Sequence, residues 1–231
     1  MTTLIHKRVE QLRSFLQERG LNAFIFPSTD PHQGEYIPDH WKTRTWISGF
    51  DGSAGTAIVT LDDAALWTDS RYFLAAGEQL KNTPFSLMKE RIEGTPSITE
   101  WLAQVLPAGS KVGIDPTVNA YGAYLSWKEE LKQNQIELVL ADDPAETLWE
   151  ERPAAPTDTI NIQPEEFCGE SVACKLNRIR EKIKDNRAEA LLLSALDEIA
   201  WTLNLRGTDI HCNPVFISYL LITPEQATLF I

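Results

Sequence analysis

An internal repeat constrains the fold of this 231-residue chain more than any other feature of its sequence. Residues 8–26 (RVEQLRSFLQERGLNAFIF) align without a gap with residues 175–193 (KLNRIREKIKDNRAEALLL), each pair 167 positions apart. The apolar positions match in pairs: Val9 and Leu176, Leu12 and Ile179, Leu16 and Ile183, Ala23 and Ala190. Two copies of one α/β unit are the economical interpretation. A chance match between two amphipathic helix–strand units is the alternative, because such units are common.

Helical and strand patterns alternate along the chain, which indicates α/β architecture with a mixed sheet flanked by helices. Apolar residues at helical spacing occur over residues 6–19, 70–80, 97–106 and 121–133. Short apolar runs typical of strands occur over residues 23–26, 56–60, 64–68, 85–89, 111–115 and 136–140. Residues 56–60 and 64–68 flank a short turn and predict a hairpin. In the helix expected over residues 70–80, Asp69 or Ser70 is the expected cap.

A proline-rich stretch divides the chain. Residues 151–165 contain three prolines with little apolar periodicity, which is typical of a linker. We therefore expect one domain over residues 1–150 and a second over residues 166–231. The second copy stops at Ile231, inside the strand that would match residues 64–68, so we expect it to be truncated.

Composition narrows the classes of function. The net charge is −12 and the chain has no basic patch, so we expect neither nucleic acid nor an anionic membrane as a partner. No apolar run approaches the length of a membrane span, and the N-terminus lacks the apolar core of a secretory signal. The three cysteines form no paired motif, which fits free thiols in a reducing, cytoplasmic compartment.

Two loops carry residue types that suggest chemistry but lack the spacing for it. Residues 30–40 (DPHQGEYIPDH) hold carboxylates and histidines, yet match no metal-site template, so we expect a polar loop at a cleft and no metal. Residues 49–56 (GFDGSAGT) are rich in glycine but lack the ending of a phosphate loop. Ser53 does not fit a nucleophile motif, because Asp51 occupies the place of its first glycine. A tight turn before a strand is the expectation.

Acidic residues and His211 in residues 195–216 also invite a metal assignment, which their spacing does not support. Arg71, in WTDSRYF, lies near the start of an expected helix, where a positive charge is unfavourable. A salt-bridge partner is one interpretation of Arg71. An arginine that contacts a peptide carboxylate at a cleft is the other.

Six strings resemble the three-domain Xaa-Pro aminopeptidases of the creatinase/prolidase ("pita-bread") group. They are PSTDPHQGEY, SGFDGSAGTAIVT, WTDSRYFLAA, VGIDP, WEERP and SALDEIAWTLNLRGTDIHCNPVFISY. The resemblance covers essentially the whole chain, with small departures at Gly34, Ser70 and Thr208. It implies a creatinase-like N-terminal domain followed by the first part of a second one.

The resemblance also implies a function for the parent protein. Such enzymes are hydrolases that remove the N-terminal residue from peptides with proline second, using two Mn(II) ions in a third domain that these 231 residues do not include. We therefore expect this chain alone to be inactive, to hold no catalytic residue and no metal, and to contribute substrate gating and contacts of a cytoplasmic homodimer. Glu35 is the expected partner of a peptide N-terminus, and Arg71 of the other end of a short substrate.

A binding module is the alternative, because creatinase-like folds are reused without metals and fold alone does not fix function. The five metal ligands expected downstream in the gene discriminate between the two.

Overall fold

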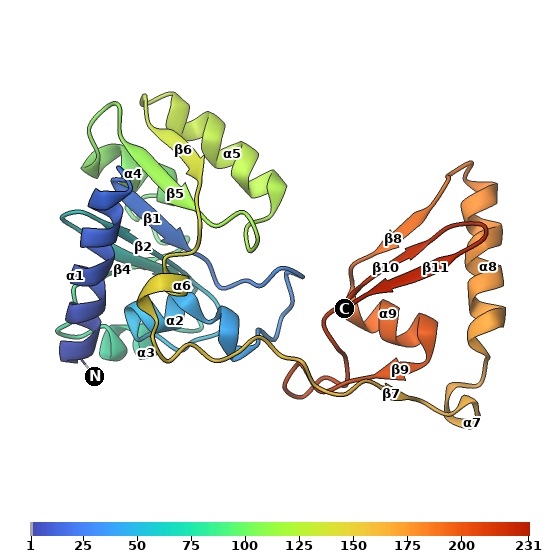
Figure 1. Cartoon of the computed structure of the whole chain (residues 1–231). Coiled ribbons are helices and arrows are strands. Elements are labelled where there is room, and N and C mark those ends of the chain that lie inside the picture. Colours follow the sequence, from blue (N-terminus) through green and yellow to red (C-terminus); the bar gives the residue numbers. More distant parts are fainter. Residues whose placement is uncertain (1) are drawn as a thin grey trace. The chain divides into compact units, whose positions relative to one another are not determined.

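The computed structural model describes residues 2–231 and comprises two compact units (Figure 1). The first unit ends at Pro153, and the second is Ala154–Ile231. Among the described residues, none of the helices has the length and apolar character needed to cross a membrane.

The first unit is a three-layer α/β sandwich around a six-stranded mixed sheet with the order β4-β3-β2-β1-β5-β6. Its strands are β1 (Ala23–Phe26), β2 (Thr56–Thr60), β3 (Ala64–Thr68), β4 (Ser86–Lys89), β5 (Lys111–Ile114) and β6 (Glu137–Leu140). β2 pairs antiparallel with both β1 and β3, whereas the remaining neighbours are parallel. This confirms the expected mixed sheet and the hairpin.

Helices cover both faces of this sheet, and the strands β1, β2 and β3 are almost entirely buried. Their bounds are α1 (Thr2–Glu18), η1 (Asp39–Trp41), α2 (Thr43–Ser48), α3 (Phe73–Gln79), α4 (Ile98–Val105), α5 (Tyr121–Lys132) and α6 (Ala145–Leu148). Phe24 and Phe26 of β1 pack in the core that contains residues of α1, α2, α3 and α6. The intervening residues Ala23 and Ile25 pack in the core formed with α4 and α5. The alternation follows from the two-residue period of a strand.

The expected start of α3 is wrong. The helix begins at Phe73 and its N-cap is Tyr72, with no side-chain capping bond. Asp69 lies three residues before that N-cap, and its carboxylate accepts hydrogen bonds from the main-chain N and the side chain of Arg71. By contrast, Ser97 caps α4 and forms a capping box with Glu100.

The second unit repeats the start of the first. It contains β7 (Asn161–Ile162), α7 (Glu165–Cys168), α8 (Val172–Asp185), β8 (Leu191–Leu193), α9 (Leu196–Leu203), β9 (Leu205–Arg206), β10 (Tyr219–Ile222) and β11 (Ala227–Phe230). Its main sheet has the order β11-β10-β8, both pairs antiparallel. The order matches β3-β2-β1, and α8 precedes β8 as α1 precedes β1, which confirms the repeat.

The stretch expected as a linker contains one short element. Residues 161–162 form β7, which pairs with β9. A two-residue ladder is too short to leave a periodic signal in the sequence.

Candidate functional site

The topology of the first unit brings three separate loops to one edge of its sheet. β1 and β3 run in the same direction because each pairs antiparallel with β2 between them. The loop after β1, the loop before β2 and the loop after β3 therefore share an edge. Ligands of α/β proteins commonly bind outside the carboxyl ends of parallel strands. These loops carry Glu35, Ser53 and Arg71 respectively.

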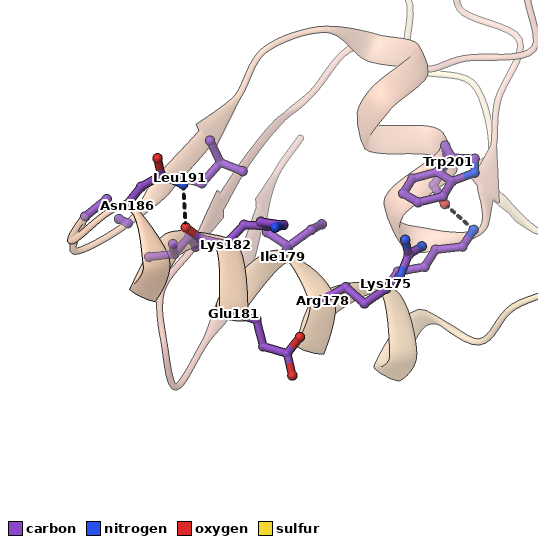
Figure 2. A pocket seen from close by; sticks show the side chains of 11 residues that line it. Lys175, Arg178, Ile179, Glu181, Lys182, Asn186, Leu191 and Trp201 are labelled. Atoms are coloured by element: carbon purple, nitrogen blue, oxygen red, sulfur yellow. Dashed lines mark hydrogen bonds between the residues drawn. The ribbon is translucent and has the colours of Figure 1, made fainter.

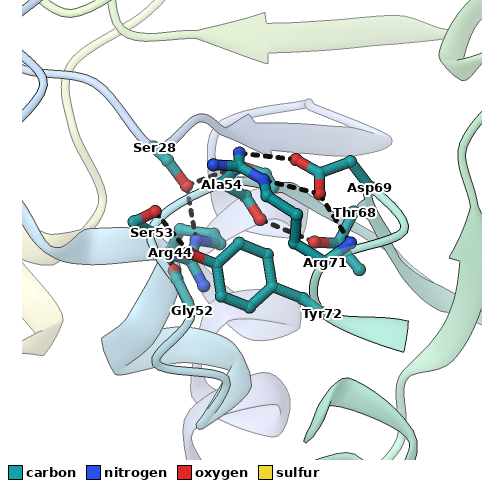
Figure 3. A network of polar contacts seen from close by, with 10 residues as sticks. Ser28, Arg44, Gly52, Ser53, Ala54, Thr68, Asp69, Arg71 and Tyr72 are labelled. Atoms are coloured by element: carbon teal, nitrogen blue, oxygen red, sulfur yellow. Dashed lines mark hydrogen bonds and ion pairs between the residues drawn. The ribbon is translucent and has the colours of Figure 1, made fainter. Parts of the chain in front are cut away.

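Arg44 of α2 holds the loop before β2 in place (Figure 3). Its side chain donates from Nε to Ser28 Oγ at 2.7 Å and from one terminal nitrogen to the main-chain O of Phe50 at 2.6 Å. The other terminal nitrogen donates to the main-chain O of Gly52. Burial lowers the pKa of Arg44 to about 10, against the opposing influence of Asp51 and Tyr72. Because the buried Arg44 guanidinium donates to all three of these acceptors, it stabilises the loop and is not available to bind a ligand.

Two glycines of the same loop are required by close packing. A Cβ atom at Gly52 would lie 2.3 Å from Phe50 Cζ and 2.8 Å from Tyr72 Cδ1. At Gly55, where φ is +157°, a Cβ atom would lie 2.7 Å from the main-chain O of Trp67. The glycine-rich stretch is therefore a tight turn before β2, as expected.

Ser53 is joined to the loop after β3. Its Oγ lies 2.7 Å from Tyr72 Oη, a hydrogen bond that lowers the pKa of Tyr72. Thr68 Oγ1 donates to the main-chain O of Ala54 at 2.7 Å and ties the two loops a second time. The hydrogen-bonding partner of Ser53 is thus a tyrosine and not a histidine, so Ser53 has a structural role.

Arg71 forms a two-pronged ion pair with Asp69 (Figure 3). Its Nε and a terminal nitrogen donate to the two carboxylate oxygens at 3.0 and 2.8 Å. These hydrogen bonds lower the pKa of Asp69 to about 2. The Arg71 side chain nevertheless remains 66% exposed, and its guanidinium lies 5.3 Å from the centre of the Tyr72 ring. Arg71 therefore pairs with Asp69 while most of its side chain stays exposed to solvent.

Glu35 lies on an exposed part of the loop after β1, whose turn is held by a buried carboxylate. Asp30 is 2% exposed, and its Oδ1 accepts from the main-chain N of His32 and of Gly34, both at 3.0 Å. The pKa of Arg71 is raised chiefly by hydrogen bonding to Asp69 and in smaller part by the charges of Asp69, Tyr72 and Glu35. Glu35 and Arg71 therefore lie on two loops at the same edge of the sheet.

The polar clusters that invited a metal assignment form no such site. Within residues 2–231, no three His, Cys, Asp or Glu side chains are grouped so as to hold a metal ion. Asp209 instead accepts hydrogen bonds from the main-chain N of Asp158 and of Ile217. The residues present therefore do not fit a dinuclear metal centre.

Sequence reasoning missed Arg44 and Tyr72. Arg44 lies in a short stretch, TRTWIS, that carries too few apolar positions to predict α2. The sequence did give a signal for Tyr72, because it is adjacent to Arg71. Its contact with Ser53 was not predictable, because the two residues lie 19 positions apart on loops that meet only in the folded chain.

Two family models describe the chain. A Creatinase/Prolidase N-terminal domain model matches residues 8–148, and a second model of the same description matches residues 151–231. The chain belongs to the creatinase/prolidase N-terminal domain family.

The relatives of the chain are Xaa-Pro aminopeptidases, whose N-terminal portion it matches. Xaa-Pro aminopeptidase 1 of Dictyostelium discoideum is 43% identical over 98% of this chain, and Xaa-Pro aminopeptidase ApepP of Drosophila melanogaster is 42% identical over all of it. The chain spans 38% of the length of each. X-prolyl aminopeptidase from Caenorhabditis elegans, a cytosolic enzyme with a di-nuclear active site, has a crystal structure that matches with a TM-score of 0.89. That match has 32% identity and covers 98% of this chain and 38% of the other.

Proposed function

We propose that this chain is the N-terminal part of a metal-dependent Xaa-Pro aminopeptidase, which removes the N-terminal residue from short peptides with proline second. The observation that carries the proposal is that the loops holding Glu35 and Arg71 leave the same edge of the sheet. The family resemblance assigns substrate contacts to these two residues. The identity of 43% with a named Xaa-Pro aminopeptidase over 98% of the chain supports it.

We assign no metal ligand to this chain. The described residues offer no grouping for a metal ion. Two Mn(II) ions are the cofactor that the resemblance implies. The di-nuclear active site of the C. elegans enzyme supports a two-metal centre in the whole protein.

The charges of the loop cluster suit a short peptide, which is cationic at one end and anionic at the other. Glu35 presents an exposed carboxylate for the α-ammonium group. Arg71 is held in one orientation by Asp69 yet keeps most of its side chain open, so it is preorganised for a carboxylate. Together the two residues limit substrates to short peptides, which is the gating role.

We further propose a cytoplasmic homodimer. The family resemblance supports the dimer, and the C. elegans relative, a cytosolic enzyme, supports the compartment. Sedimentation velocity of the longer natural polypeptide checks the dimer, and a monomer at micromolar concentration contradicts it.

The experiment for the site uses the longer natural polypeptide with Glu35→Ala, Glu35→Gln, Arg71→Ala and Arg71→Lys. Because each alanine variant removes a charged partner of the peptide, it should lower kcat/KM for Arg-Pro-Pro by roughly 10- to 100-fold. Glu137→Gln is the matched control, because Glu137 begins β6 at the opposite edge of the sheet. Wild-type kcat/KM in both alanine variants would remove Glu35 and Arg71 from the proposed site.

A further inference from the structure

The second unit has a cavity on the side of α8 that faces Trp201 (Figure 2). Its volume is about 470 Å³, and its lining is mainly apolar. The walls include Lys175, Ile179, Lys182, Ile183, Leu191 and Trp201. Trp201, the most conspicuous of these side chains, is 47% exposed.

The first unit contains the same arrangement of a cation and a tryptophan. In the second unit Lys175 Nζ donates to the main-chain O of Trp201 at 2.8 Å and lies 4.1 Å from the ring centre. In the first unit a terminal nitrogen of Arg8 donates to the main-chain O of Trp46 at 2.6 Å, and the guanidinium lies 5.4 Å from the ring centre. Arg8 and Lys175 are matched by the repeat, 167 positions apart.

The two tryptophans also hold the same position in their helices. Trp46 lies three residues before Gly49, the C-cap of α2, and Trp201 lies three residues before Asn204, the C-cap of α9. Both caps adopt the left-handed conformation, with φ of +77° and +51°. Trp46 and Trp201 are therefore equivalent.

In the first unit, the position that corresponds to the cavity is filled by α6 and Trp149 of the same unit. Trp46 is only 4% exposed, because Trp149 stacks on it with ring centres 5.6 Å apart and an angle of 15°. Phe15, Leu16 and Phe24 belong to the same core as Ala145 and Leu148 of α6 and Trp149. The repeat matches those three residues to Lys182, Ile183 and Leu191, which line the cavity of the second unit.

We propose that the cavity beside Trp201 seats a short helix ending in an aromatic residue, which stacks on Trp201 as Trp149 stacks on Trp46. The occupant is a segment of the longer polypeptide, so the proposal rests on the proposed function. Trp149 comes 81 residues after Thr68, the end of β3, which places the segment at a similar distance beyond β11. The second unit has Lys182 where the first has Phe15, so we expect acidic residues in the segment that the cavity seats.

Hydroxyl-radical footprinting with mass spectrometry tests this proposal on the 231-residue chain and on the longer natural polypeptide. Trp201 is 47% exposed, whereas the covered Trp46 is 4% exposed. Trp201 should therefore be oxidised about tenfold more slowly in the longer polypeptide. Trp46 is the internal control and should not change. Trp149→Ala in the 231-residue chain should raise the oxidation rate of Trp46 toward that of Trp201. This variant checks that a stacked aromatic residue is what protects a tryptophan at this position of the repeat.

A photo-crosslinking residue at position 201 of the longer polypeptide locates the occupant, and the expected crosslink lies near an aromatic residue about 80 positions beyond β11. Equal oxidation of Trp201 in both chains would overturn the proposal. Protection that grows with the concentration of the 231-residue chain would also overturn it, by making a second copy the occupant. Hydrolysis of Arg-Pro-Pro by the same longer sample tests the proposed function separately.

Discussion

Lys175 Nζ donates to the main-chain O of Trp201 at 2.8 Å and to Asn204 Oδ1 at 2.6 Å, although the lysine is only 2% exposed. These contacts join α8 to the C-terminal end of α9. Arg8 makes the corresponding contact with Trp46 in the first unit. Each unit therefore uses a cation on its long helix, α1 or α8, to fix the helix that follows the next strand, α2 after β1 or α9 after β8.

The pairing predicts how Lys175 tolerates substitution. Lys175→Met removes a charged donor and leaves buried acceptors unpaired, which should lower the free energy of unfolding of the second unit by about 2–3 kcal/mol. Lys175→Arg should cost less, because Arg8 makes the same contact. Hydrogen exchange of α8 and α9 measures both. Lys182→Met, at an 80% exposed side chain, is the control and should change stability by less than about 1 kcal/mol. Equal effects of the Met and Arg variants of Lys175 would contradict this role.

The turn before β2 should not accept a side chain at Gly52. Because the new Cβ atom would lie 2.3 Å from Phe50 Cζ, Gly52→Ala should destabilise the first unit by about 1–3 kcal/mol. Gly122→Ala is the matched control. Gly122 lies in α5 with open space around it, so alanine there should stabilise the helix by up to about 1 kcal/mol. Urea unfolding compares the two variants, and a neutral Gly52→Ala would show that the loop is less closely packed than described.

Arg152 and Asp143 form a buried ion pair that orders the end of the first unit. Their side chains are 9% and 10% exposed, and the charged atoms lie 2.9 Å apart. Burial raises the pKa of Asp143 despite Arg152, so loss of the partner is costly. Arg152→Met should lower the free energy of unfolding by about 3–5 kcal/mol.

Asp143→Asn should recover part of that loss in the double variant, because it removes the unpaired charge. Lys111→Met, which breaks an exposed pair of 3.9 Å with Glu137, is the control and should cost less than about 1 kcal/mol. Calorimetric unfolding distinguishes the variants, and an Arg152→Met effect as small as the control would refute the pairing.

The Asp69–Arg71 pair predicts a pH dependence with a definite sign. The pKa of Asp69 is about 2, below its ordinary value of 3.8, so the pair stabilises the folded state above about pH 4. That contribution disappears as the pH falls through 2. NMR titration of the Asp69 carboxyl carbon should show the low midpoint in the parent chain, and Arg71→Ala should return it toward 3.8. A midpoint near 3.8 in the parent chain would mean that the ion pair does not form in solution.

Much of the fold was accessible from the sequence because its signals are local. The apolar runs of β1 and β2 and the Ser97 cap of α4 each depend on a few neighbouring residues. The helix α2 was not accessible, since six residues give too short a periodic pattern. The stack of Trp46 on Trp149 joins residues 103 positions apart, and no local pattern marks such a contact.

The candidate site was accessible only in part. Glu35 and Arg71 stand out as charges in loops after strands, so residue type and position suggested them. Arg44 gave no such signal, because its role depends on main-chain oxygens of Phe50 and Gly52 that only the folded loop brings within reach. A salt-bridge partner for Arg71 was foreseeable, but the start of α3 at Phe73 was not.

Hydrolysis of Arg-Pro-Pro with added Mn(II), by the 231-residue chain beside the longer natural polypeptide, tests the central claim most directly. The account predicts hydrolysis by the longer polypeptide, its loss on chelation of the metal, and none by the 231-residue chain. Hydrolysis by the 231-residue chain would contradict the account, because a metal site would then lie within residues that show no grouping for one. Hydrolysis by neither would contradict it in favour of a metal-free binding module.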